Sequence, residues 1–324
     1  MIEPSTLREA RSAREAEPSA AALARVLGSL ETIILGKPRQ VRLCLACLLA
    51  RGHLLIEDVP GVGKTTLAHA LAHVLGLAWQ RVQFTSDLLP ADIIGVSVFD
   101  RSSQQFHFRQ GPIFTQLLLA DEVNRASPRT QSALLEAMEE RQVSVDLTTH
   151  HLPEPFFVVA TQNPHEELGT FALPESQLDR FLMRITLGYP DARSERELLR
   201  KGERRDLLSE MPSALDAAGI VRIQHTVRGV HVSDALLDYV QALVARTRER
   251  TDLKLGLSPR AAQGLIRAAQ AWAYLAARTA VLPEDVQAVL PAVAAHRLES
   301  RDTASAVDGA RLAEDLVKRV PVPL

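Results

Sequence analysis

One stretch of the chain decides its fold, and it reads His53-Leu54-Leu55-Ile56-Glu57-Asp58-Val59-Pro60-Gly61-Val62-Gly63-Lys64-Thr65-Thr66. The apolar run at 54–56 predicts a buried strand, and the glycines after it predict a tight turn. Apolar residues then recur at helical spacing from Leu67 to Leu75, which predicts a helix. The order strand, glycine-rich loop and helix is the context that a phosphate-binding loop requires.

The loop carries the groups that phosphate binding needs. Glycines let backbone N–H groups approach phosphate oxygens, and the following helix points the positive end of its dipole at the anion. Lys64 can reach the β- and γ-phosphates of a nucleotide, and the Thr65 hydroxyl can bind Mg²⁺. The residues that we expect to bind the nucleotide here are Val59, Pro60, Gly61, Val62, Gly63, Lys64, Thr65 and Thr66.

The match to the pattern G-x-x-x-x-G-K-[ST] fails at its first position, where Asp58 stands in place of glycine. Taken alone, the stretch also fits a plain strand–turn–helix unit with an exposed lysine. Segments further along the chain favour the phosphate-binding interpretation.

Composition limits what the chain can be. Its 324 residues, of which 46% are hydrophobic, suffice for two domains with sizeable cores. The 37 basic and 39 acidic residues give a net charge of −2, without the basic excess typical of nucleic-acid-binding proteins, so nucleic acid is not an expected partner. No apolar run reaches the ~18–20 residues of a membrane span, and residues 1–17 lack an apolar signal core. We therefore expect a cytoplasmic protein with no membrane span.

Cys44 and Cys47 have a C-x-x-C spacing, which admits a redox or zinc site. Their neighbours are leucine and alanine, and the sequence holds no second cysteine pair to complete a metal site. We expect both thiols to act as small hydrophobic groups on one face of a buried helix. Two thiols without a disulfide framework also fit a reducing compartment.

A second apolar run, at 117–120, ends in Asp121 and Glu122. Beside a phosphate loop, carboxylates at the end of a parallel strand favour a functional role over the alternative of solvated surface acids. Asp121 is predicted to hold Mg²⁺, directly or through water, and Glu122 to orient and deprotonate the attacking water. Asn163 follows another buried strand, and it is predicted to polarise the same water or to contact the γ-phosphate.

Turn and cap residues place the other elements. Polar turns predict two hairpins, near 96–108 and 143–152, and the second has His150 and His151 at its loop tip, where a carboxylate or cysteine partner for a metal is not evident. Gly52 is expected to end the helix before the phosphate loop. Further helices are predicted to start after Ser127, Ser233 and Ser258, near Pro283 and near Ala310, and a charged helix and linker occupy the segment from Asp191 to about Pro212.

This order of motifs resembles that of the AAA+ ATPases, and the sequence between the motifs resembles that of the MoxR family within them. The resemblance covers about residues 25–300, and Asp58 in place of glycine is the form that this family usually shows. The stretches that carry it are Glu57 to Thr65, Phe84 to Gly95, Gly111 to Met138, Ala160-Thr161-Gln162-Asn163-Pro164 and Leu178-Asp179-Arg180-Phe181.

The resemblance implies an α/β fold, in which an AAA+ P-loop αβα core with a parallel sheet and β-hairpin inserts precedes a small all-α lid domain. The implied units are an N-terminal lead-in at 1–24, a nucleotide-binding core at 25–190, a charged helix and linker at 191–215, and a helical lid at 216–324. The hairpins would be the helix-2 insert and the pre-sensor-1 insert of the family.

The resemblance also implies roles for single residues. Lys64 and Thr65 match the Walker A pair, Asp121 and Glu122 match Walker B, and Asn163 falls at sensor 1. These positions agree with the roles that we derive above from the residues themselves.

Two arginines gain a role only through the resemblance. Arg180 lies where related ring ATPases carry the arginine finger, which acts on the nucleotide of a neighbouring subunit, and Arg260 matches sensor 2 on the lid. A guanidinium at either place can stabilise the negative charge that γ-phosphate cleavage spreads. The alternative for both is an ordinary surface or locally paired arginine. The loop from Ile33 to Gly36, with Ile34 and Gly36 as its nucleotide-binding residues, would line the adenine pocket.

The implied function is hydrolysis of ATP with Mg²⁺ at the subunit interfaces of a homo-oligomeric ring, expected as a hexamer. Family members remodel or activate other proteins in a chaperone-like way, often with a separate partner that carries a von Willebrand factor A domain. A chelatase- or helicase-like motor is an alternative, because the inserts resemble those relatives, although the near-neutral charge argues against DNA. A nucleotide-dependent scaffold with little turnover is the other alternative, against which the complete set of site residues argues.

Overall fold

The computed structural model describes residues 21–163, 169–201, 208, 211–301 and 309–322. Most of the predicted lead-in, Pro164, and parts of the predicted linker and of the lid lie outside these residues. The predicted boundaries at 24, 190 and 215 stay predictions. None of the described helices has the length and apolar character needed to cross a membrane.

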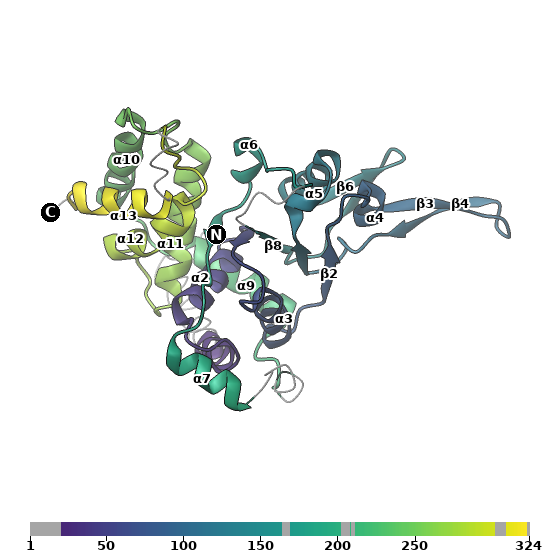
Figure 1. Cartoon of the computed structure of the whole chain (residues 1–324), viewed down its shortest axis with the longest axis horizontal. Helices are drawn as coiled ribbons and strands as arrows, with labels where there is room; N and C mark the ends of the chain where they lie inside the picture. Colours follow the sequence, from purple (N-terminus) through teal and green to yellow (C-terminus); the bar gives the residue numbers. More distant parts are fainter. Residues whose placement is uncertain (1–20, 164–168, 202–207, 209–210, 302–308, 323–324) are drawn as a thin grey trace, which may run out of the picture.

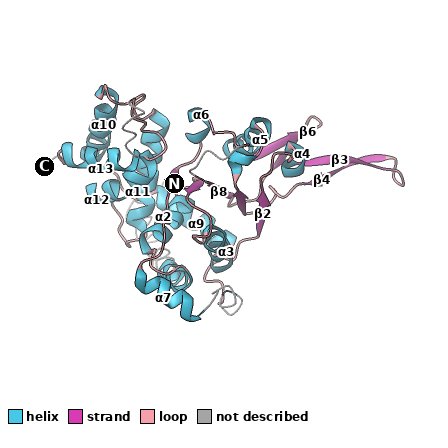
Figure 2. Cartoon of the chain, in the orientation of Figure 1, coloured by secondary structure: helices cyan, strands magenta, loops and turns pink. Residues whose placement is uncertain are grey.

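A parallel sheet of five strands forms the centre of the core (Figure 2). Its strands read as nearly continuous apolar runs because both faces are covered, as is usual for parallel sheets. The register pairs Glu57 with Gln162 and Ala120 with Ala160, so the strands end together at one edge of the sheet. In spatial order the strands are β2 (Trp79–Gln83), β5 (Leu117–Asp121), β8 (Phe157–Gln162), β1 (Leu54–Glu57) and β9 (Met183–Ile185).

Alternate residues of these strands point into two apolar clusters, one on each face of the sheet. Leu54 and Ile56 of β1 belong to the first cluster, whereas Leu55 belongs to the second. The helices α2 (Pro38–Leu49) and α3 (Lys64–Val74) cover the first face, and α4 (Pro90–Ile94) and α5 (Pro128–Glu140) cover the second. This three-layer arrangement confirms the predicted αβα core.

Both predicted hairpins are present. The first, β3 (Gly95–Asp100) with β4 (Gln105–Gln110), projects far from the body of the molecule (Figure 1). The second pairs β6 (Gln142–Val145) with β7 (Thr148–His151).

The expected position of His150 and His151 is wrong. Both lie within strand β7, and His150 stacks on Phe108 of the first hairpin with ring centroids 4.0 Å apart. The turn is formed instead by Asp146 and Leu147, whose φ angles of 48° and 66° suit the two-residue turn that joins antiparallel strands tightly. The turn was expected among polar residues, but it contains Leu147, which is apolar yet fully exposed. The polarity of the sequence therefore predicts the turn at the wrong position.

A helical part follows the core and lies on the opposite side of the molecule from the first hairpin (Figure 1). Serine side chains cap three helices as predicted, because Ser127, Ser233 and Ser258 each accept a bond from a backbone N–H of the first turn. The helix starts predicted from the sequence do not include that of α9, which begins after Asp216. The helices of this part are α7 (Ala192–Lys201), α9 (Ala217–Arg228), α10 (Asp234–Glu249), α11 (Pro259–Tyr274), α12 (Pro283–Ala294) and α13 (Gly309–Arg319), and a short helix α6 (Glu175–Leu178) precedes β9.

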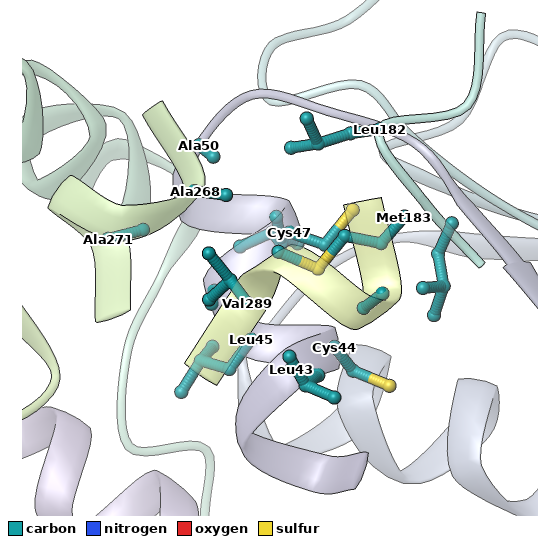
Figure 3. Close-up of a cluster of buried hydrophobic side chains, with 14 of the residues drawn as sticks. Leu43, Cys44, Leu45, Cys47, Ala50, Leu182, Met183, Ala268, Ala271 and Val289 are labelled. Atoms are coloured by element: carbon teal, nitrogen blue, oxygen red, sulfur yellow. The ribbon is translucent and has the colours of Figure 1, made fainter. Parts of the chain in front are cut away.

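The core and the helical part share one apolar cluster, which Figure 3 shows around α2. Cys44 and Cys47 are fully buried in it, and burial raises the pKa of both thiols. Ala268 and Val289, from α11 and α12, belong to the same cluster. The expectation that both cysteines are buried small hydrophobic groups is therefore confirmed.

The predicted role of Gly52 as the residue that ends α2 is wrong. Arg51 takes the left-handed conformation after this helix, with φ of 56°. Gly52 is needed for a different reason, since an added Cβ there would lie 2.3 Å from Cβ of Leu182.

His53, directly before β1, is expected to make the stability of the protein depend on pH. Val158 N–H donates to its Nδ1 at 3.0 Å, its Nε2 lies 3.1 Å from the carbonyl oxygen of Met138, and burial lowers its pKa to about 3. In the unfolded chain the His53 imidazole binds a proton below about pH 6.5, whereas in the folded chain it stays neutral down to about pH 3. The folded state therefore loses stability as the pH falls from about 6.5 toward 3. Near pH 5.5 the expected loss is ~1.4 kcal/mol.

Urea unfolding at pH 7.5 and pH 5.5 measures this loss. The variant His53→Leu is expected to be less stable at pH 7.5, yet to lose less on acidification than the unchanged protein. His107→Leu, which changes an exposed histidine of the β3–β4 hairpin, is the matched control. Equal acid losses in all three proteins would contradict the assignment.

Candidate functional site

A cavity of about 530 Å³ lies at the edge of the sheet where the parallel strands end. It brings together the phosphate loop, the end of β5 and the residue after β8, which are far apart in the sequence. Predicted site residues supply most of its walls. The lining residues are Ile33, Ile34, Leu35, Lys37, Pro60, Gly61, Val62, Gly63, Lys64, Thr65, Thr66, Asp121, Glu122, Asn163, Pro190 and Leu198.

The loop has the backbone that close approach to an anion requires. Gly61 and Gly63 have φ angles of 84° and 94°, which favour glycine, and apart from the adjacent residues no described atom lies within 4 Å of where their Cβ atoms would stand. Helix α3 starts at Lys64, and no described side chain caps it. Its first N–H groups therefore remain available to a phosphate group.

Lys64 is held at the centre of the site. Its Nζ donates to the carbonyl oxygen of Asp58 at 2.6 Å and to Oδ1 of Asn163 at 3.1 Å. Burial lowers the pKa of this lysine, while the nearby Asp58, Asp121 and Glu122 act in the opposite direction. The structure thus joins the predicted Walker A lysine to the predicted sensor 1 asparagine.

Asp121 is the buried end of β5. The Thr161 hydroxyl donates to its Oδ1 at 2.6 Å, and Arg81 donates to its Oδ2 at 2.7 Å. Each carboxylate oxygen keeps further acceptor capacity. Together with the Thr65 hydroxyl, which lines the same cavity, Asp121 offers the oxygen ligands that Mg²⁺ prefers.

The described residues hold no group of three or more acidic, cysteine or histidine side chains suited to a metal ion. A Mg²⁺ site of this type needs fewer protein ligands, because water and phosphate oxygens complete it. The residues present therefore fit a magnesium ion that arrives with a nucleotide.

Glu122 has an unusual backbone, with φ of 55°. Its N–H donates to the Thr161 hydroxyl at 2.9 Å, and its Oε2 accepts bonds from Gln83 at 2.9 Å and Arg125 at 3.0 Å. These contacts hold the carboxylate at the cavity wall. A left-handed residue that is not glycine, fixed by its neighbours, is often found at functional sites.

Four residues that no sequence motif indicates hold the two acids, namely Arg81, Gln83, Arg125 and Thr161. Arg81 and Gln83 stand two apart in β2, so alternation places them on one face of the strand. Their contacts with the two acids arise because Gln83 pairs with Asp121 in the sheet. The sequence alone does not show which strands are neighbours.

Arg180 and Arg260 do not line this cavity. Both bind Glu139 of α5, with Arg180 Nε 3.0 Å and an Arg260 guanidinium nitrogen 2.8 Å from its carboxylate oxygens. They lie in a second, smaller cavity of about 130 Å³, where Arg141 and Arg267 add positive charge. The structure places the two predicted catalytic arginines together, but apart from the phosphate loop of their own chain.

Two predicted nucleotide-binding residues lie outside the cavity lining. Ile34 lines it, but Gly36 and Val59 do not. Gly36 has φ of 70°, and an added Cβ would lie 2.5 Å from Oγ of Ser194 on α7, so this glycine permits close packing of α7. The predicted contact of Gly36 with a bound nucleotide stays a prediction.

Comparison with known proteins agrees with this geometry. Residues 53–183 match the ATPase family associated with various cellular activities (AAA), and residues 245–319 match the AAA lid domain. A crystal structure of a protein from Cytophaga hutchinsonii superposes with a TM-score of 0.89 at 33% identity, over 99% of this chain and 100% of that chain.

Three curated proteins illustrate the sequence similarity. The chain is 41% identical to YeaC of Bacillus subtilis, over 93% of this chain and 95% of that protein. It is 42% identical to Chaperone MoxR1 of Mycobacterium tuberculosis, over 85% and 75%. It is 36% identical to MoxR of Paracoccus denitrificans, over 83% and 86%. These matches and the αβα core show that the chain belongs to the MoxR family of AAA+ ATPases.

Proposed function

We propose that this ATPase hydrolyses Mg-ATP at sites shared between neighbouring subunits of a ring, expected as a hexamer. One observation carries the proposal. The loop, Glu122 and Asn163 meet at one cavity, whereas Arg180 and Arg260 lie together elsewhere on the chain. The two arginines can reach the phosphates of a bound nucleotide most simply if that nucleotide sits in the cavity of an adjacent subunit.

Each residue of the cavity then has a task. Lys64 and the loop N–H groups bind the β- and γ-phosphates, and Glu122 takes the proton of the attacking water. Asn163, already bonded to Lys64, orients that water or the γ-phosphate. A magnesium ion held by Thr65 and Asp121 would supply positive charge against the phosphate oxygens.

We further propose that the ATP cycle serves chaperone-like remodelling of partner proteins, in which a separate protein with a von Willebrand factor A domain takes part. The similarity to Chaperone MoxR1 supports this. The projecting β3–β4 hairpin supports it too, because Val96, Val98 and Phe106 are exposed on it. Exposed apolar side chains on a projecting element suit contact with another protein.

ATP turnover measured against protein concentration, with the mass of the assembly determined on the same samples, tests the shared site. Turnover per chain is expected to rise steeply as rings form, because an isolated chain lacks the arginines of a neighbour. Turnover that stays constant from the monomer to the assembled state would contradict the proposal.

Replacing Glu122 by glutamine is expected to leave ATP binding intact and to reduce turnover by about 100-fold or more, because glutamine cannot accept the proton. Its amide keeps most of the shape, so the ring should persist with ATP bound. Glu136→Gln, at an exposed site on α5, controls for the loss of one negative charge. Full turnover by Glu122→Gln would show that another group is the base.

A further inference from the structure

Asp58, the residue that departs from the usual glycine pattern, is buried and fully engaged. The residue is 5% exposed and directly follows β1. Oδ1 accepts the N–H of Val59 at 2.8 Å, and Oδ2 accepts the N–H groups of Leu187 and Gly188, both at 2.6 Å. Glycine, the residue of the general phosphate-loop pattern, could make none of these side-chain bonds.

The residues that Asp58 binds belong to the segment 187–190, which joins β9 to α7. Lys37 Nζ also holds this segment, through the carbonyl oxygen of Tyr189 at 2.7 Å. Pro190 of this segment lines the nucleotide cavity, and so does Leu198 of the following helix, α7. The segment is therefore both a wall of the site and the path from the core to α7.

The backbone carbonyl group of Asp58 contacts the phosphate loop and not the segment 187–190. Its carbonyl oxygen accepts the 2.6 Å bond from Lys64 Nζ, the group expected to bind phosphate. One residue thus contacts the phosphate-binding lysine through its backbone and the segment 187–190 through its side chain. A carboxylate this close to a phosphate site is costly unless donors surround it, and three backbone N–H groups do so here.

We propose that Asp58 is a positioning residue that ties the phosphate loop to the segment 187–190, so that a nucleotide in the loop also holds the start of α7 in place. The tie itself follows from the hydrogen bonds, whereas its response to nucleotide rests on the proposed function.

Hydrogen exchange at the Leu187 and Gly188 amides tests the tie, with the full chain and two variants. Asp58→Gly supplies the residue of the general loop pattern, so the loop can still fold, and Asp58→Ala removes both carboxylate oxygens without adding the backbone freedom of glycine. Without nucleotide, both variants are expected to exchange these two amides about tenfold faster or more, with the amides of β1 and β8 unchanged. Unchanged exchange at 187–188 would overturn the tie.

A non-hydrolysable ATP analogue then tests the coupling. In the unchanged protein, the analogue is expected to slow exchange both in the loop, at 61–66, and in the segment 187–190. In the Asp58 variants it should slow the loop but change the segment by less than about twofold. A segment that slows equally in all three proteins would overturn the coupling, since Asp58 would then be a local structural group only.

Asp285→Asn is the matched control. Asp285 is another buried carboxylate, in the lid, which accepts the N–H of Leu282 and binds Arg278. This variant should lose stability without changing exchange at 187–188 in either state. If the analogue fails to slow the loop even in the unchanged protein, nucleotide binding at this site is wrong, while the comparison without nucleotide still decides the tie.

Discussion

Replacing Arg180 by alanine is expected to reduce ATP turnover by about 10³-fold or more while nucleotide binding and assembly persist. Arg180 lies outside the cavity of its own chain and binds Glu139, so its loss leaves the phosphate loop intact. A guanidinium that reaches a neighbouring site acts mainly on the charge that develops during γ-phosphate transfer, so its removal affects the rate rather than affinity.

Three measurements separate this outcome from simple damage. Nucleotide affinity and assembly mass should match those of the unchanged protein, and only the multiple-turnover rate should fall. Arg246→Ala removes an exposed arginine of α10 that pairs with Glu249 in the same way, and it should keep full turnover. If Arg180→Ala remains active in assembled rings, Arg180 has no part in catalysis.

Replacing Lys64 by alanine is expected to abolish nucleotide binding at working concentrations. A buried ammonium that bonds to a phosphate contributes ~3 kcal/mol, which corresponds to at least about 100-fold in affinity. The change also removes the bonds to Asp58 and Asn163, so the loop loses its central contact.

Titration with a fluorescent ATP analogue measures this loss directly. Lys254→Ala, which removes an exposed lysine paired with Glu299, is the control and should bind as the unchanged protein does. Unfolding curves show whether Lys64→Ala remains folded, and we expect it to, since the apolar clusters on both faces of the sheet are unchanged. Tight binding by a folded Lys64→Ala would place the nucleotide elsewhere.

The core of the fold could be predicted because its signals are local. The apolar strands, the glycines at 61 and 63, and the serine caps at 127, 233 and 258 each determine their own neighbourhood. The turn at 146–147 could not, because an exposed leucine with positive φ contradicts the usual composition of turns.

Site residues could be predicted where a single segment of the sequence supplies them. Contacts between residues from different segments could not be predicted, because they depend on which segments lie side by side. Lys64 follows a glycine-rich loop, and Asp121 and Glu122 follow an apolar run, so their positions could be derived from the sequence. The contacts of Arg81 and Gln83 with these acids depend on β2 lying beside β5, and the bonds of Asp58 depend on a segment more than a hundred positions away. The shared contact of Arg180 and Arg260 with Glu139 is of the same kind.

Mixing the inactive variants Lys64→Ala and Arg180→Ala tests the shared site most directly. In a mixed ring, a site with Lys64 from one chain and Arg180 from its neighbour is complete, so turnover should rise from near zero toward about a quarter of that of the unchanged protein. Chains with two different tags, purified in succession, prove that mixed rings have formed. Mixed rings that stay as inactive as either variant alone would contradict a site built from two subunits.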